Sequence, residues 1–478
     1  MTWKTIDGKK GIKCRLTMRG FKDRTTDLET FAGTASRCGQ RVVNTMAAQE
    51  DTFELWSFDV SQAFAKGLTF DELAELTDTP LRKVEFDLSP EDVAILKQIP
   101  GYETFDPTRE TLSMSKAMYG LKDAPRAWRK RLHQVLTEFG YQQLRAEPEL
   151  YVLHDQSGKS KELEDGLDKA IAGQLKEMIE VERQGGTEAK NNHRTRRTEK
   201  QVFKKILGIL SAHVDDLKGA STKSGGLKLL KALEAKSGPY KSEWNNFLHT
   251  GIQHDRRPGG IMTHQQKYVE NLLPNDLSNL KGDDEELVSE EFHSKFNSLL
   301  GGVAWTILTR PDLAVYVQAL QRRGAGPRVA DLKRLSLAFR YLKRHKLGIW
   351  SGQVPKPWRI QGFSDSAFRA QENESTGLAL RGLAVLLTTA SEVTPTSPTG
   401  AVCLVDFLVR RLRRVVRSTF SAELNAVLDS IETLLVTQIC FHQVLCGTTE
   451  SPAELMRLLE TGQLHPPIEL VTDARSVL

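Results

Sequence analysis

A continuous apolar run from Ile206 to Val214 ends at two adjacent aspartates, Asp215 and Asp216. Such a run, without polar alternation, is typical of a strand that is buried on both faces. The chain must therefore build a sheet that is covered on two sides. Residues 53–60 alternate between apolar and polar types, which predicts a second strand with Asp59 near its end.

The chain has 478 residues, a length that suits roughly two to four domains. Helical spacing is seen over residues 127–139, before Gly140, and over residues 291–346. A long amphipathic helix is expected over residues 421–446, with Ser421 as its cap. Breaks are predicted in a charged insertion (156–205), an acidic loop (282–286) and a Pro- and Gly-containing linker (352–358).

Composition indicates a soluble globular protein, with 39% hydrophobic and 27% charged residues. The net charge of +5 permits a polyanionic partner without requiring one, and basic runs such as 341–346 and 410–414 can equally be solvated surface. The five cysteines lack zinc-ligand spacing, which favours reduced thiols in the cytoplasm or nucleus. No leader and no apolar stretch of about 18 residues is apparent, so we expect neither secretion nor a membrane span.

Aspartates at the ends of different strands suit nucleotidyl transfer. Two divalent ions about 3.5–4 Å apart can activate a hydroxyl and steady a leaving pyrophosphate. Mg²⁺ prefers carboxylate oxygens, and Mn²⁺ can substitute for it. Asp59, Asp215 and Asp216 are the candidates. The simpler alternative is that Asp215 and Asp216 only form a hairpin turn, where aspartate is common.

Several segments, taken in order, resemble the reverse transcriptases of copia-type retrotransposons. The resemblance covers almost the whole chain outside 156–205 and rests on residues 13–21, 30–32, 58–64, 118–128, 213–217, 308–313 and 340–343. The segment from Met118 to Trp128 is the most specific. Two positions differ from many members of the family, which have an aromatic residue at His213 and glutamine at Asp123.

The resemblance implies roles for individual residues. Asp59, Asp215 and Asp216 would bind the metals, together with the Val60 carbonyl. The other implied contacts are with nucleotide: Lys13 and Arg15 with the incoming triphosphate, Phe64 as a steric gate against a 2′-hydroxyl, and Tyr119 and Gly120 beside the nascent base pair. Ordinary core packing is the alternative for Phe64.

A second acidic set follows the linker. Asp365 and Asp473 each end a predicted strand, and Glu423 lies near the start of the long predicted helix. Such carboxylates can hold two metals that activate water against a phosphodiester. Downstream of a polymerase they resemble the ligands of a ribonuclease H (RNase H) domain. That family normally has a fourth acidic residue and a last helix beyond residue 478, so we expect an incomplete domain that a partner chain or the remainder of a polyprotein completes.

The implied architecture is an α+β polymerase right hand with an antiparallel palm sheet, followed by a C-terminally truncated α/β RNase H-like domain. Fingers and palm would occupy residues 1–245, the thumb and connection 246–350, and the RNase H-like domain 359–478. The expected partners are an RNA template, a DNA primer, RNA–DNA hybrids and deoxynucleoside triphosphates. Candidate phosphate contacts are Arg310, Arg340, Lys343 and the 410–417 cluster. The alternative is a decayed or domesticated element that binds nucleic acid without catalysis.

Overall fold

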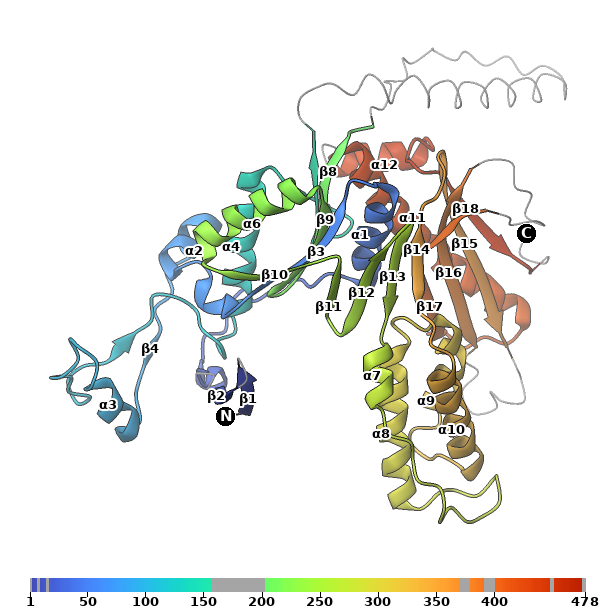
Figure 1. Cartoon of the computed structure of the whole chain (residues 1–478), viewed down its shortest axis with the longest axis horizontal. Coiled ribbons are helices and arrows are strands. Elements are labelled where there is room, and N and C mark those ends of the chain that lie inside the picture. Colours follow the sequence, from blue (N-terminus) through green and yellow to red (C-terminus); the bar gives the residue numbers. More distant parts are fainter. Residues whose placement is uncertain are drawn as a thin grey trace.

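The computed structural model describes residues 2–6, 9–13, 17–155, 203–368, 379–390, 400–447 and 451–474 (Figure 1). The predicted insertion at 156–205 lies outside the described residues except for its last three.

A six-stranded antiparallel sheet forms the first half of the chain. Its strand order is β10 (Tyr240–Trp244), β3 (Glu54–Val60), β9 (Asp216–Ser221), β8 (Ile206–His213), β7 (Leu150–His154) and β6 (Gln142–Gln143). Helices α4 (Ala124–Phe139) and α6 (Lys223–Ser237) cover one face, packing around Trp56 and Phe58. Helix α1 (Arg37–Gln49) covers the other face around Leu55 and Ala220. The predicted strand at 206–214 is observed as β8, which ends at His213. Its residues 208–212 are buried as predicted, whereas Leu207 is exposed.

Smaller elements lie beside this first sheet (Figure 1). A hairpin of β1 (Thr2–Ile6) and β2 (Lys9–Lys13) opens the chain. A second unit holds α2 (Phe70–Thr77), α3 (Pro90–Leu96) and the short strands β4 (Glu85–Phe86) and β5 (Leu112–Ser113). A capping box formed by Thr69 and Glu72 begins α2.

A second sheet has eight strands, ordered β11-β12-β13-β14-β17-β16-β15-β18. Their bounds are β11 (Asn246–His249), β12 (Ile252–Arg257), β13 (Gly260–His264), β14 (Ile349–Gly352), β15 (Trp358–Ala367), β16 (Leu380–Thr389), β17 (Val402–Arg411) and β18 (Ile468–Thr472). Among these strands, β15 and β18 form the parallel pair. The segment expected as a linker, 352–358, connects β14 to β15 within this one sheet, and its first and last residues belong to those strands.

A bundle of four helices lies at one end of this sheet (Figure 1). Its helices are α7 (Gln266–Asn271), α8 (Glu290–Thr306), α9 (Ala314–Gln321) and α10 (Val329–Arg344). They enclose their own core, which includes Phe296, Leu335 and Phe339. The segment expected as one thumb and connection, 246–350, is therefore divided in space. Its strands extend the second sheet and its helices form the bundle.

Helix α11 (Thr419–Cys446) packs across β15 and β18, and α12 (Pro452–Glu460) follows it. The predicted cap at Ser421 is wrong, because Ser418 caps the helix and its hydroxyl accepts the Ser421 N–H. Among the described residues, α11 is long and apolar enough to cross a membrane, contrary to the expectation of no such stretch. Here it lies on the sheet, with the Ser430 hydroxyl bonded to that of Ser364 at 3.0 Å.

Helix α1 joins the two sheets. One hydrophobic cluster runs from Val43 and Leu55 through to Val385 and Leu434. Arg41 on α1 pairs with Asp406 on β17 at 2.7 Å and donates to the Leu308 carbonyl at 3.2 Å. Both halves of the chain therefore share a core, and the position of one acidic set is tied to that of the other.

Candidate active sites

The first acidic set lies at the end of β3 and in the β8–β9 hairpin. Asp59 and Asp216 are direct cross-strand partners, and Asp215 precedes Asp216 in the turn. Val214 in this turn has a φ of 59°, a strained conformation for a β-branched residue. The Trp128 indole N–H donates to the Val214 carbonyl at 2.7 Å, so α4 holds the turn in place.

The three carboxylates of this first set repel one another electrostatically. Burial, together with the charges of Asp215 and Asp59, raises the pKa of Asp216 to about 6. Half-buried like charges of this kind favour a bound cation, which suits Mg²⁺ or Mn²⁺. The carboxylates of this first set lie further apart than those of the second. In the described part of the chain, only the second set brings one ligand atom from each of three residues within 4.8 Å of one another.

Three of the residues expected to contact the nucleotide, Phe64, Tyr119 and Gly120, lie close together. The rings of Phe64 and Tyr119 lie 4.9 Å apart, and both are partly exposed. Gly120 has a φ of 96°, and a Cβ there would lie 2.0 Å from the Met18 carbonyl oxygen. The Met18 N–H donates to the Tyr119 carbonyl at 2.7 Å. Glycine at 120 thus allows the segment near Met18 to lie against the aromatic pair.

The remaining expected nucleotide contacts are less fully defined. Lys13 ends β2, and Arg15 lies outside the described residues. Val60 is buried, and its N–H donates to the Asp215 carbonyl at 3.4 Å. His213, one of the two positions that differ from the copia-type pattern, is paired with Asp216 across the β8–β9 hairpin and so lies directly beside a candidate metal ligand.

The second departure, Asp123, is completely buried at the start of α4 and forms an ion pair with Arg82. Arg82 also pairs with Asp23 at 2.5 Å. The three residues join the segments around 23, 82 and 123 in one charged contact. Sequence reasoning missed Arg82, because nothing in the local pattern around it indicates a distant carboxylate.

Lys218 is a second residue that sequence reasoning missed. It lies on β9 two residues after Asp216, is 1% exposed, and donates to the Gln40 carbonyl at 2.8 Å and to Asn44 Oδ1 at 3.1 Å. Burial lowers the pKa of Lys218 from 10.5 to about 7. The Lys218 amine therefore links the aspartate hairpin to α1. The sequence offers one signal for this role, which is the position of a lysine in a strand that is covered on both faces.

We expect the free energy of unfolding to rise between about pH 7.5 and 8.5, by about 1.4 kcal/mol per pH unit for the Lys218 proton. In that window the unfolded chain keeps a proton that the folded protein has released, because the folded pKa is the lower one. The Lys218→Met variant should lose this slope, and a variant of the exposed Lys231 to Met should keep it. Urea unfolding at the two pH values measures the difference. Equal slopes in wild type and Lys218→Met would contradict the assignment.

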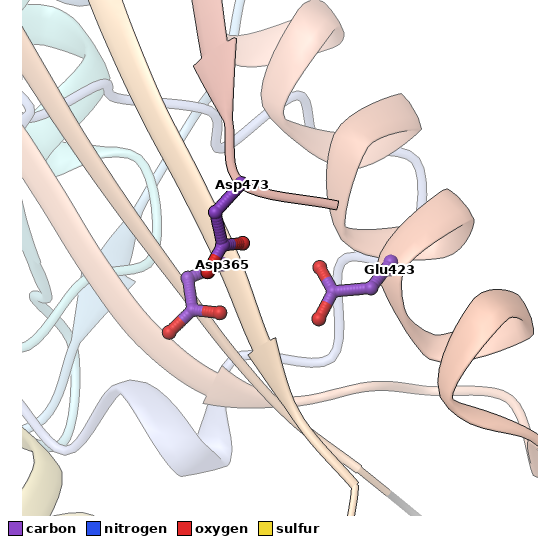
Figure 2. Close-up of side chains that lie close together, drawn as sticks. All are labelled: Asp365, Glu423 and Asp473. Carbon is purple, nitrogen blue, oxygen red and sulfur yellow. The ribbon is translucent and has the colours of Figure 1, made fainter. Parts of the chain in front are cut away.

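The second acidic set converges from three elements (Figure 2). Asp365 is on β15, Asp473 directly follows β18, and Glu423 is on α11. The parallel pairing of Ser364 with Thr472 places the next residues, Asp365 and Asp473, side by side. One ligand atom from each of the three carboxylates lies within 4.8 Å of the others. Asp365 lies before the end of its strand, not at the end as predicted.

The environment of Glu423 indicates a cation site. This residue is 7% exposed, and its Oε2 atom is buried without a hydrogen-bond partner among the described residues. Burial raises the pKa of Glu423, and the charges of Asp365 and Asp473 add to that effect. A buried carboxylate oxygen without a partner is costly, so a divalent ion held by all three groups would relieve it. The donor set therefore fits Mg²⁺ or Mn²⁺.

Comparisons with known proteins relate the chain to mobile elements. It is 28% identical over 150 residues to the Retrovirus-related Pol polyprotein from transposon RE1 of Arabidopsis thaliana, covering 31% of this chain and 9% of that protein. It is 23% identical over 346 residues to the corresponding polyprotein from transposon RE2, covering 69% of this chain and 19% of that protein. The chain thus spans less than a fifth of the length of either relative. No protein-family model matches it.

Proposed function

We propose that this chain, a relative of retrotransposon Pol polyproteins, is an RNA-directed DNA polymerase that also hydrolyses the RNA strand of RNA–DNA hybrids. The observation that carries the proposal is the cross-strand pairing of Asp59 with Asp216, with Asp215 in the adjoining turn. The expected partners are an RNA template, a DNA primer and deoxynucleoside triphosphates.

At the polymerase site, Mg²⁺ or Mn²⁺ would lower the pKa of the primer 3′-hydroxyl and steady the leaving pyrophosphate. Asp59, Asp215 and Asp216 would hold the ions with the Val60 carbonyl. Trp128 holds the strained hairpin turn through its bond to the Val214 carbonyl, which restricts movement of the backbone that carries Asp215. Lys13 and Arg15 are proposed to bind the triphosphate, where a guanidinium matches phosphate oxygens.

At the hydrolytic site, Asp365, Glu423 and Asp473 would hold the ions that activate water. Glu423 is the buried member of the set, so its side chain is the one fixed by packing. Its position on α11 sets the third carboxylate opposite the two strand residues (Figure 2). Asp365 and Asp473 are exposed, which leaves them open to a nucleic-acid strand.

Primer extension on an RNA template with Mg²⁺ or Mn²⁺ tests the polymerase proposal. The wild type should extend the primer, and Asp59→Asn should not, because an amide is a poorer ligand for a hard cation than a carboxylate. Duplex binding by both proteins, measured in parallel, is the control for folding. Absence of extension by the wild type with duplex binding retained would instead support a relic that only binds nucleic acid.

Phe64→Val should reduce discrimination against ribonucleotides by about ten- to a hundredfold, since loss of steric fit in a pocket changes selectivity by about 1–3 kcal/mol. The smaller side chain leaves room for a 2′-hydroxyl beside Tyr119, which now lies 4.9 Å from the Phe64 ring. The measurement is the ratio of kcat/KM for a deoxynucleotide to that for the matching ribonucleotide. Phe21→Val, at a residue 83% exposed, is the control. An unchanged ratio would assign Phe64 to packing alone.

A further inference from the structure

A groove of about 870 Å³ lies where the helical bundle meets the second sheet. Its side chains come from α9 and the turn after it, from α10, and from the end of β17. The residues that matter here are Tyr316, Arg322, Arg323, Arg334, Tyr341 and Arg411. We call this set the arginine groove. None of these residues belongs to either carboxylate set.

The arginine groove presents more positive than negative charge. Its two acidic residues, Asp312 and Asp331, already have partners. The Arg310 guanidinium donates two hydrogen bonds to Asp312, and Asp331 accepts the Arg328 backbone N–H at the start of α10. Arg334 has a side chain 70% exposed and touches Asp331 at 3.4 Å. The Nε of Arg411 is buried without a hydrogen-bond partner among the described residues. The exposed guanidinium groups of Arg323 and Arg334 thus face solvent, where an anionic ligand can reach them.

A second cavity, next to the hydrolytic carboxylates, lies near the arginine groove. Its volume is about 550 Å³, and its lining includes Asp365, Asp473, Val409 and Pro311. Pro311 precedes Asp312 in the chain, and Val409 lies two residues before Arg411, and both Asp312 and Arg411 line the arginine groove. We call the surface that holds the two cavities, from the carboxylates to the bundle, the trough.

The register of the sheet fixes the spacing within this trough. Asp365 is opposite Gly382, which is opposite Val409, and Arg411 lies two residues further along β17 on the same face. With strands ~4.8 Å apart and a rise of ~3.3 Å per residue, Arg411 lies about 12 Å from Asp365. Phosphates a few nucleotides from a scissile bond would fall at this distance.

We infer that the arginine groove binds the phosphate backbone of an RNA–DNA hybrid while its RNA strand lies at Asp365, Glu423 and Asp473. The inference rests on the proposed hydrolytic function. An arginine fork binds phosphate oxygens in a bidentate manner, which a lysine or an amide does not. Tyr316, 65% exposed among these arginines, provides an aromatic edge for sugar or base contact.

The sequence-based candidates for phosphate contact overlap this set only at Arg411, which belongs to the 410–417 cluster. Arg310 is 3% exposed, and its guanidinium is bound to Asp312 and to the His345 carbonyl, so it has no open face for a phosphate. Arg340 is exposed on α10 but does not line the groove. Arg344, exposed at the end of α10, neither lines the groove nor belongs to those candidates, so it is a matched control for Arg334 of the same residue type on the same helix.

The test is binding of a labelled RNA–DNA hybrid to the full chain between about 50 and 200 mM salt. The triple variant Arg323→Gln/Arg334→Gln/Arg411→Gln should raise the Kd by about tenfold or more. It should also reduce the salt slope by about 2–3, since each lost phosphate contact removes about 0.9. Arg344→Gln should leave both unchanged. If the triple variant unfolds at a lower temperature than the wild type, the double variant Arg323→Gln/Arg334→Gln, at two exposed positions, replaces it in the same binding measurement.

Hybrid cleavage by the wild type is measured on the same samples, so that two failures can be told apart. Cleavage by the wild type with normal hybrid binding by the triple variant overturns the groove and leaves the proposed function standing. Absence of both binding and cleavage in the wild type overturns both. Loss of polyglutamate binding in the variant, with hybrid binding unchanged, would make the groove a docking site for acidic protein segments and overturn the inference.

Discussion

Asp216→Asn is expected to lower the rate of primer extension by about a thousandfold while making the metal-free protein more stable. Loss of a carboxylate ligand removes several kcal/mol of transition-state stabilisation, and each 1.36 kcal/mol is a factor of about ten. The stability gain has a separate cause. Burial and the charges of Asp215 and Asp59 raise the pKa of Asp216 to about 6.

The sign of the stability effect follows from that pKa. The folded pKa is above the ordinary value of 3.8, so ionised Asp216 destabilises the fold above about pH 6, and the penalty disappears as the pH falls below 3.8. The amide removes the charge, and for a half-exposed group the gain at neutral pH is about 1–2 kcal/mol after solvent screening. Thermal unfolding without metal measures it, with the exposed Asp71→Asn as control. A less stable, inactive variant would indicate a fold defect instead.

Arg82→Met should reduce the free energy of unfolding by about 3–5 kcal/mol, because it leaves a buried carboxylate without its partner. Asp123 is completely buried, and Arg82 is its ion-pair partner as well as that of Asp23. The same contact holds the start of α4, whose Trp128 fixes the aspartate hairpin. Urea denaturation at neutral pH measures the loss.

Two further variants isolate the cause of this loss. Arg109→Met removes an arginine that is 86% exposed and 3.7 Å from Asp106, and it should change stability by less than about 1 kcal/mol. In the Arg82→Met background, Asp123→Asn should restore part of the stability, because a neutral amide costs less to bury than a carboxylate. If the double variant were no more stable than Arg82→Met, an unpaired charge would not be the cause.

Local patterns predicted the strands and helices that carry the candidate ligands. The apolar run 206–214 indicates a strand because it is too short and too β-branched for a separate helix, and β8 confirms it. Gly140 after a helical pattern predicts the end of α4, and its φ of 108° confirms that end. Asp59, Asp215 and Asp473 were found because each follows or ends a recognisable strand.

Contacts between distant segments were not predictable in this way. The Arg82–Asp123 pair and the bonds of Lys218 to Gln40 and Asn44 join residues 41 to 178 positions apart, so no periodic pattern reports them. The joining of β11–β13 to the second sheet depends on β14, which enters between β13 and β17 after the bundle helices. The cap of α11 was misplaced because Ser418 and Ser421 both suit a helix start and only the backbone decides between them.

Two separate carboxylate sets in this chain are proposed to perform two reactions on one substrate. A single reaction tests it, with an end-labelled RNA template, an annealed DNA primer, deoxynucleotides and Mg²⁺, in which DNA extension and RNA cleavage are read together. The wild type should show both. Asp216→Asn should lose extension and keep cleavage, and Glu423→Gln should do the reverse. The two-site proposal would be contradicted if the wild type showed neither activity, or if either variant lost both activities together.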